Sequence, residues 1–248
     1  MTNDLSGSVI AITGASSGIG EATALACAGA GAAVALAARR GDRIEALAAR
    51  IEEDGGRAIA LPTDVADERQ ARAFVEHTYE KLGRLDVLVN NAGVMLLGAV
   101  AGADTDEWRR MIDVNLLGLL YCTHAALPVM AAQGSGHIVN VSSVAGRSAN
   151  AGSAVYNLTK FGVGAFSEAL RQEALHAGIR VTIIEPGATE SELMSHNSDA
   201  VKEIALKRFE GVTRLQSEDI ANAIVYALAQ PEHVSINEVL IRPSKQSR

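Results

Sequence analysis

The sequence predicts a single-domain α/β fold in which a doubly wound, seven-stranded parallel sheet is covered by helices on both faces. Short runs of β-branched residues and leucine recur along the 248 residues, and each is too apolar for a half-exposed strand. Helical patterns alternate with these runs, and aromatic residues make up only 4% of the chain, which suits close packing of helices on a sheet. The expected strands are Val9–Thr13, Ala33–Ala37, Ala58–Leu61, Leu85–Val89, His137–Ser142, Val181–Ile184 and Val239–Ile241.

The segments between these strands have the period of amphipathic helices. Ile44, Leu47 and Ile51 recur on one helix face, with arginine and glutamate on the other. Asp67 and Ser217 are expected to cap the N-termini of two later helices. No linker or repeat divides the chain, so we expect one dinucleotide-binding and catalytic domain over residues 1–248.

One long stretch, from Gly187 to about Gly211, lacks a clear period and lies between the sixth strand and the next helix. Irregular segments of this length are usually functional, so we expect a substrate lid at about residues 188–211. Its charged residues can each be explained by simple solvation; they are Glu190, Glu192, His196, Lys202 and Arg208.

Composition excludes several classes of function. The formal net charge of −7 disfavours a general nucleic-acid binder, because such binding depends on lysine and arginine contacts with phosphates. Cys27 and Cys122 are too few for a disulfide framework or a metal cluster, so we expect no metal site. Residues 1–8 lack the pattern of a signal peptide, and no apolar run is expected to be long enough to span a bilayer, so a cytoplasmic protein without a membrane partner is expected.

A glycine-rich turn follows the first strand and opens a helical run. Gly14 and Gly18 permit a tight turn, and Gly20 lets helix and strand approach closely, so that the helix N-terminus can face a pyrophosphate. The intervening residues Ser16, Ser17 and Ile19 belong to the same expected site. A turn of this kind is weak evidence alone, because strand-to-helix turns need glycine anyway.

The end of the second strand predicts the cofactor. In dinucleotide-binding folds an acidic residue about twenty positions after the glycine motif hydrogen-bonds the adenosine ribose and repels a 2′-phosphate. Ala38 stands at that position, and Arg39 and Arg40 follow it. Because a guanidinium can bind a phosphate with two parallel bonds, we expect NADPH to be preferred over NADH.

The Gly-x-x-x-Gly-x-Gly spacing resembles that of the short-chain dehydrogenases, which have a Rossmann fold. The resemblance continues in Asp64-Val65 after the third strand, which is similar to the family's adenine-side pair, and in Asn90-Asn91-Ala92-Gly93 after the fourth. Both follow carboxyl ends of strands, where this fold holds its ligands. Each match alone could be turn chemistry, but they occur together and in order.

Four residues match the catalytic tetrad of this family. Tyr156 and Lys160 are four apart and so share one face of a helix, Ser143 precedes the tyrosine by thirteen positions, and Asn115 lies in a long helical stretch. Ser142 is the adjacent alternative to Ser143, and the spacing favours Ser143. A lone Tyr-Lys pair would carry little weight, because an exposed helix pair has the same spacing.

The chemistry requires these residue types. Reduction of a carbonyl leaves an alkoxide, to which Tyr156 would donate a proton, and Ser143 would hydrogen-bond the substrate oxygen. A free phenol has a pKa of about 10, and a positive charge about 4 Å away supplies about 4 kcal/mol at an effective dielectric near 20. We therefore expect Lys160 to bring the pKa of Tyr156 toward neutrality. The resemblance implies that Lys160 also holds the nicotinamide ribose and that Asn115 holds a relay water.

The resemblance extends past the sixth strand. Pro186-Gly187 is similar to the family's Pro-Gly, and backbone near Thr189 and the hydroxyl of Ser191 would meet the carboxamide, although the family usually has threonine at the latter position. The residues expected to hold the cofactor are Gly14, Ser16, Ser17, Gly18, Ile19, Gly20, Arg39, Arg40, Asp64, Val65, Asn91, Ala92, Gly93, Tyr156, Lys160, Pro186, Gly187, Thr189 and Ser191.

The C-terminal sequence departs from many relatives, which end in a glycine-rich turn. Residues 237–244, together with 37–40 and 93–98, resemble the NADP-preferring subgroup of clavulanic-acid dehydrogenase and the 3-hydroxy acid dehydrogenases. The expected substrate is a small polar carbonyl compound or alcohol, with Met95, Val144, Ala145 and Asn150 shaping its pocket. Two long helices rich in leucine and alanine, 107–130 and 155–177, predict a homo-oligomer. The resemblance implies a homodimer or homotetramer that pairs these helices.

Two other classes of function stay open. A regulator that senses the cofactor without turnover would keep the fold, but it needs no proton donor. A methyltransferase could use the glycine turn for another nucleotide, but it would need neither Tyr156 nor Lys160. Within the oxidoreductases, 3-hydroxy acids are the alternative to an aldehyde substrate.

Overall fold

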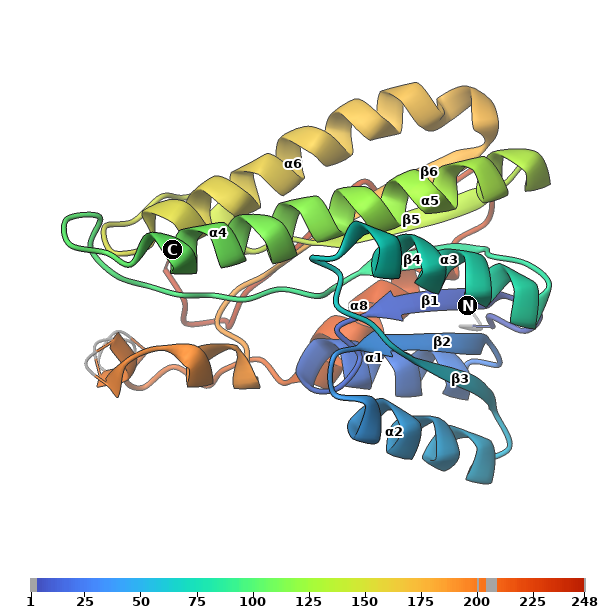
Figure 1. The fold of residues 1–248 in the computed structure, drawn as a ribbon, viewed down its shortest axis with the longest axis horizontal. Helices are drawn as coiled ribbons and strands as arrows, with labels where there is room; N and C mark the ends of the chain where they lie inside the picture. Colours follow the sequence, from blue (N-terminus) through green and yellow to red (C-terminus); the bar gives the residue numbers. More distant parts are fainter. Residues whose placement is uncertain (1–3, 200, 204–208, 248) are drawn as a thin grey trace.

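The computed structural model describes residues 4–199, 201–203 and 209–247, and it confirms the expected Rossmann architecture (Figure 1). Seven strands form one sheet in the order β3-β2-β1-β4-β5-β6-β7, and all neighbouring strands are parallel. The strands are β1 (Val9–Thr13), β2 (Ala33–Ala38), β3 (Arg57–Pro62), β4 (Val87–Asn90), β5 (Gly136–Val141), β6 (Ile179–Pro186) and β7 (Glu238–Ile241).

Helices connect the strands along the described chain. The α-helices are α1 (Gly18–Gly29), α2 (Gly41–Glu53), α3 (Glu68–Leu82), α4 (Thr105–Ile112), α5 (Gly118–Gln133), α6 (Ala154–Ala174) and α8 (Ser217–Leu228). The shorter helical segments are the π-helix η1 (Asp113–Leu117) and the 3-10 helices η2 (Val144–Gly146), η3 (Leu175–Ala177) and η4 (Glu192–His196).

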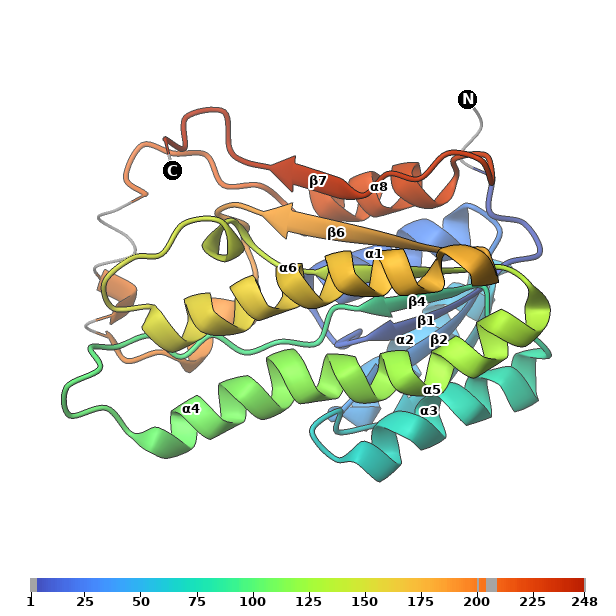
Figure 2. The same cartoon turned by 90° about the horizontal axis from the view of Figure 1, so that it is seen from above.

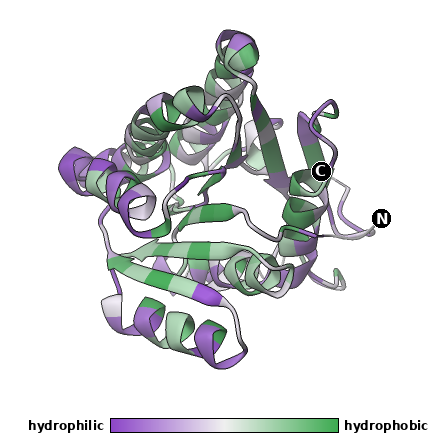
Figure 3. Ribbon diagram, turned by 90° about the vertical axis from the view of Figure 1, so that its right-hand side faces the viewer, coloured by the Kyte–Doolittle hydropathy of each residue, from purple (hydrophilic) through white to green (hydrophobic). Residues whose placement is uncertain are grey.

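The sheet separates two hydrophobic cores. Helices α1, α2 and α8 pack on one face, where Cys27 and Ile44 are fully buried. Helices α3, α5 and α6 cover the other face, where Phe74, Cys122 and Met130 are buried (Figure 2). Figure 3 shows the strands as mostly apolar and the polar residues mainly on outer helix faces and loops. Each large buried side chain contributes about 1.5–3 kcal/mol, so both layers stabilise the sheet.

The strand order places a ligand site at one edge of the sheet. The chain leaves β1 toward β2 on one side and later returns to β4 on the other, so the direction of winding reverses between β1 and β4. Because the strands are parallel, the loops after β1, β2, β4, β5 and β6 meet at the same edge. In doubly wound sheets this edge, at the point of reversal, is where ligands bind.

The two expected helix caps have different outcomes. Asp67 accepts hydrogen bonds from the backbone N–H groups of Arg69 and Gln70, as expected for the N-cap of α3. The expectation for Ser217 is wrong by one residue, because Gln216 caps α8 in a capping box with Asp219. The Ser217 hydroxyl instead donates to the carbonyl of Glu190, which ties α8 to the segment after β6.

Helix α4, the π-helix η1 and α5 join end to end into one helix, Thr105–Gln133. By length and composition it could cross a membrane, so the expectation that no apolar run reaches that length is wrong. In the fold its α5 part packs on α3 and on the sheet, and its α4 part contacts α6. An apolar helix that covers a sheet meets the same criteria as a membrane span.

Candidate active site

A cavity of about 700 Å³ opens at the carboxyl edge of the sheet. It is lined by all the expected catalytic and cofactor residues except Gly20 and Asn115, which lie directly behind its wall. Met95, Val144, Ala145 and Asn150, expected to shape a substrate pocket, also line it. Among these expected residues, the structure thus brings together positions up to 177 apart in the sequence, from Gly14 to Ser191.

The glycine turn is held in place by close packing against the end of β4. A Cβ atom on Gly20 would lie 2.3 Å from the carbonyl oxygen of Gly14, and Gly14 itself has φ +68°. The Asn91 side-chain amide donates to the carbonyl oxygens of Thr13 at 2.9 Å and Gly14 at 3.2 Å. Asn91 therefore supports the turn, and a larger residue than glycine at position 20 would displace it.

The start of α1 is suited to an anion. Ser17 is its N-cap residue but makes no capping hydrogen bond with its side chain. Gly18 and Ile19 of its first turn line the cavity. A helix N-terminus carries partial positive charge, so this end of the cavity fits a pyrophosphate.

The end of β2 adds a basic group to the same region. Nε and Nη2 of Arg40 donate to Oγ of Ser16 at 3.1 and 2.9 Å, and Nη2 also donates to Oγ of Ser17 at 2.9 Å. Arg39 is exposed and lines the cavity, as does Ala38. The region around the expected 2′-phosphate site therefore has two guanidinium groups and no carboxylate from β2.

The adenine side of the cavity depends on backbone geometry and packing. Asp64 Oδ1 accepts from the backbone N–H of Ala66 at 3.1 Å, which shapes the loop after β3. Val65 packs against Gly118 of α5 so closely that a Cβ on this glycine would lie 2.7 Å from a Val65 methyl group. Gly118 was not identified from the sequence, because its neighbour lies on another element.

The expected proton donor is buried beside its partners. Tyr156 is 6% exposed on α6 and forms a hydrogen bond with Ser143. Nζ of Lys160 lies 5.8 Å from the Tyr156 ring centroid and donates to the carbonyl oxygen of Val141 at 2.9 Å. The Ser142 hydroxyl donates to the backbone of Lys160 instead, so the geometry favours Ser143 as the residue that meets a substrate oxygen.

The two key pKa values move in a direction that the sequence did not indicate. Burial raises the pKa of Tyr156 to about 12, and the hydrogen bond from Ser143 opposes this only in part. Burial lowers the pKa of Lys160 to about 8. The expectation that Lys160 brings the tyrosine pKa toward neutrality is wrong for this arrangement, because desolvation disfavours both charged forms. Tyr156 is therefore a protonated donor throughout the neutral range.

Asn115 lies in the π-helix η1, where its buried side chain is already engaged. Oδ1 accepts from the backbone N–H of Val94 at 2.8 Å, and Nδ2 donates to the Val94 carbonyl at 2.9 Å and to Oγ1 of Thr159 at 3.2 Å. Asn115 thus connects the segment after β4 to α6 just before Lys160. Because both N–H groups of its amide are engaged, the side chain can offer a relay water only the second lone pair of Oδ1.

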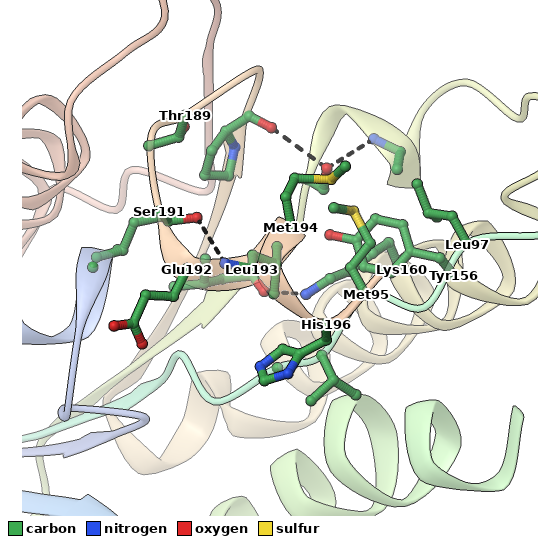
Figure 4. Close-up of a pocket in the computed structure, with 18 of the residues that line it drawn as sticks. Met95, Leu97, Tyr156, Lys160, Thr189, Ser191, Glu192, Leu193, Met194 and His196 are labelled. Atoms are coloured by element: carbon green, nitrogen blue, oxygen red, sulfur yellow. Dashed lines mark hydrogen bonds between the residues drawn. The ribbon is translucent and has the colours of Figure 1, made fainter. Parts of the chain in front are cut away.

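The segment after β6 crosses the cavity as a strap, which we define as residues 187–199. Thr189 pairs with Leu215, and Oγ of Ser191 accepts from the backbone N–H of Leu193 at the start of η4. Figure 4 shows Met194 of the strap beside Met95 and Tyr156. Of the charged residues, Glu192 and His196 line the cavity, and Arg208 lies outside the described residues.

The sequence did not identify two residues that hold this strap. Oδ1 of Asn197 accepts from the backbone N–H of Leu97 at 2.7 Å, and its Nδ2 donates to the carbonyl of Met95 at 2.8 Å. Oε1 of Gln246 accepts from the backbone N–H of Ala188 at 2.9 Å. The partners are 100, 102 and 58 positions apart, so no local pattern could reveal these contacts.

Comparison with known proteins gives consistent matches. The sequence model of the family described as short chain dehydrogenase matches residues 8–202. An uncharacterized oxidoreductase of Staphylococcus saprophyticus is 44% identical over 248 residues, covering 99% of both proteins. The glycine betaine reductase ATRR of Emericella nidulans is 45% identical over 96% of this chain, which spans 19% of that longer protein.

Among solved structures, the closed form of serine dehydrogenase complexed with NADP+ has a TM-score of 0.90 and 32% identity, covering 97% of this chain and 96% of that one. The family match spans most of the chain, and the structural match covers 97% of it. On this evidence, the chain belongs to the short chain dehydrogenase family of oxidoreductases.

Proposed function

We propose that this protein uses NADP(H) to reduce an aldehyde or ketone of a small polar molecule to an alcohol, or catalyses the reverse reaction. The observation that carries the proposal is the buried Tyr156, hydrogen-bonded to Ser143 and close to Lys160, in one cavity with the glycine turn and Arg40. A cofactor sensor would need no proton donor there. NADPH consumption with aldehydes and ketones, and NADP+ reduction with 3-hydroxy acids, test the proposal, and cofactor binding without turnover across the panel would favour the sensor.

The residues fit a dinucleotide. The first turn of α1 and Arg40 can take its phosphates, and the contact between Gly20 and Gly14 keeps the backbone cradle open to them. Lys160 can bind ribose hydroxyls, and Thr189 and Ser191, which line the cavity with Pro186 and Gly187, would meet the nicotinamide. The bound cofactor would exchange a hydride with the substrate carbon.

The protein's own groups handle the proton. Ser143 would bind the substrate oxygen and orient it toward Tyr156. The Tyr156 hydroxyl would donate its proton to the oxygen as negative charge develops, and it would accept the proton in alcohol oxidation. An ammonium on Lys160 would stabilise the resulting phenolate, and the buried setting would exclude water from the reacting atoms.

The names of two similar proteins suggest the substrate class. One is named a serine dehydrogenase and another a glycine betaine reductase, and both names refer to small polar molecules that carry a carboxylate. In this chain Arg214 and His196 line the same cavity as Met95 and Met194. The assay panel should therefore include serine, other 3-hydroxy acids and aldehydes that carry a charged group beside simple aldehydes.

The strap and the segment to residue 211 would act as a substrate lid. Replacing Asn197 with alanine removes the hydrogen bonds to Met95 and Leu97 that hold the strap over the catalytic side of the cavity. We expect KM for the carbonyl substrate to rise by about five- to thirtyfold, because two hydrogen bonds contribute about 1–2 kcal/mol. The Kd for NADPH should change little, and an unchanged KM in steady-state kinetics would contradict the lid assignment.

The pH dependence of reduction should follow Lys160. Its pKa of about 8 means that the ammonium is present below this pH and is lost as the pH rises through it, whereas Tyr156 stays protonated to a pKa of about 12. We expect kcat/KM for carbonyl reduction to fall as the pH rises through about 8, because a neutral amine on Lys160 no longer stabilises the phenolate. The pH profile of Lys160→Gln should not change slope near pH 8. The same change of slope in that variant would show that another group titrates there.

We also expect a cytoplasmic homo-oligomer. Leu158, Phe161 and Leu175 are exposed along α6 and η3, and family members pair such helices in dimers or tetramers. Light scattering at micromolar concentration should give a mass at least twice that of the 25.9 kDa chain. Phe161→Glu should lower this mass, because it places a charge on an apolar contact. A monomeric mass for the wild type would contradict the expectation.

A further inference from the structure

An ion pair joins the strap to the expected 2′-phosphate site. Glu192 Oε2 lies 2.8 Å from Nη1 of Arg40, and Oε1 lies 2.8 Å from Nη1 of Arg43. The carboxylate thus bridges the end of β2 and the first turn of α2, about 150 positions away in the sequence. Figure 4 shows Glu192 directed away from Tyr156 and Lys160, so it is not aimed at the reacting atoms.

The same guanidinium serves both the glycine turn and the strap. Nε and Nη2 of Arg40 bond to the hydroxyls of Ser16 and Ser17, and Nη1 bonds to Glu192. At the end of β2, where dinucleotide folds that select NADH have an acidic residue, this chain has Ala38. The strap therefore supplies a carboxylate to the region where β2 lacks one.

We propose that Glu192 is a specificity-determining residue, a strap carboxylate that competes with the 2′-phosphate of NADPH for Arg40 and so limits the preference for NADPH over NADH. The proposal rests on the cofactor preference proposed above, because it assumes that the phosphate meets Arg40. Binding of the phosphate then requires Glu192 to leave Arg40, whereas a cofactor with a ribose hydroxyl leaves the ion pair in place.

The charges support a competition. The hydrogen bonds and charges of Arg43 and Arg40 lower the pKa of Glu192 to about 2, so the carboxylate is ionised at any pH of interest. Two anions on one guanidinium repel each other, and Arg43 can retain Glu192 when Arg40 turns to the phosphate. All three side chains are about half exposed, so the effect should be modest rather than absolute.

Calorimetric titration with NADP+ and NAD+ tests the proposal without requiring turnover. Glu192→Gln should lower the Kd for NADP+ by about two- to fivefold, the range expected for exposed ion pairs, and leave the Kd for NAD+ unchanged. Glu190→Gln is the matched control, because it removes the same charge two positions away from Glu192. The Glu190 carboxylate bonds to Gln216 and not to these arginines. Equal shifts for both cofactors, equal shifts in both variants, or weaker NADP+ binding would overturn the proposal.

A double variant shows whether Arg40 carries the effect. In an Arg40→Gln background, Glu192→Gln should no longer improve NADP+ binding, because the shared guanidinium is gone. Persistence of the improvement would overturn the proposal. The wild-type comparison is read separately: tighter binding of NAD+ than NADP+ would contradict the proposed cofactor preference, while the contrast between Glu192→Gln and Glu190→Gln would still decide the role of Glu192.

Discussion

Replacing Tyr156 with phenylalanine is expected to lower kcat by about 10²–10⁴-fold, the contribution usual for a positioned general acid. The ring is buried and packs with Val94, Leu96 and Met111, and these contacts do not involve the hydroxyl. The variant therefore loses the group that donates the proton and hydrogen-bonds Ser143, but keeps the packing. Steady-state kinetics with the best carbonyl substrate measure the loss.

Cofactor binding and folding provide the controls for this variant. The Kd for NADPH and the Tm should stay close to those of the wild type, because phenylalanine fills the same space. Tyr79→Phe is a matched substitution on α3, where the tyrosine is 45% exposed, and it should leave kcat unchanged. Near-wild-type turnover of Tyr156→Phe would remove Tyr156 from the proposed mechanism.

The fold could be predicted because buried parallel strands have a strong local pattern. The expected first strand coincides with β1, whereas the expected Val181–Ile184 is shorter than β6, Ile179–Pro186. The extra residues include polar ones whose burial is satisfied by partners that the sequence does not show. Arg180 donates to the carbonyls of Gln230 and Val234, and Arg147 forms an ion pair with the buried Glu185.

The motif residues could be predicted because their spacing and their places at strand ends already bring them together. Tyr156 and Lys160 share a helix face, and Ser143 ends up beside them because β5 runs to the same edge of the sheet. Asn197 and Gln246 could not be predicted in this way, because each acts on backbone from a distant element. Such contacts depend on how the strap and the C-terminal residues pack on the folded sheet.

The pKa values show a second limit of the sequence. The spacing of Tyr156 and Lys160 suggested that the lysine charge lowers the pKa of the tyrosine. The opposing cost of removing charged groups from water depends on burial, which the spacing does not show. Both groups are almost fully enclosed by the cavity wall, so burial exceeds the attraction that the spacing alone implied. A sequence can indicate which groups meet, whereas their protonation depends on the dielectric environment that the fold creates.

Replacing Ala38 with aspartate is expected to reverse or abolish the preference for NADPH. Ala38 lines the cavity at the end of β2, next to Arg39 and Arg40, so an added carboxylate would face a 2′-phosphate and could accept a hydrogen bond from a 2′-hydroxyl. It would also compete for the Arg40 guanidinium, which already bonds to Ser16. A charged hydrogen bond contributes about 1.5–3 kcal/mol, so the ratio of kcat/KM for NADPH to that for NADH should fall by roughly ten- to a hundredfold.

The charge of the new residue, and not its size, should cause this change. Ala38→Asn adds a side chain of nearly the same shape without the charge, so it should shift the ratio far less than Ala38→Asp. Arg40→Gln should also lower the ratio, because it removes a positive group from the phosphate side while leaving β2 unchanged. Kinetics with both cofactors in the wild type and the three variants measure these effects. A wild type that favours NADH, or equal shifts in the aspartate and asparagine variants, would show that the end of β2 does not select the cofactor by charge.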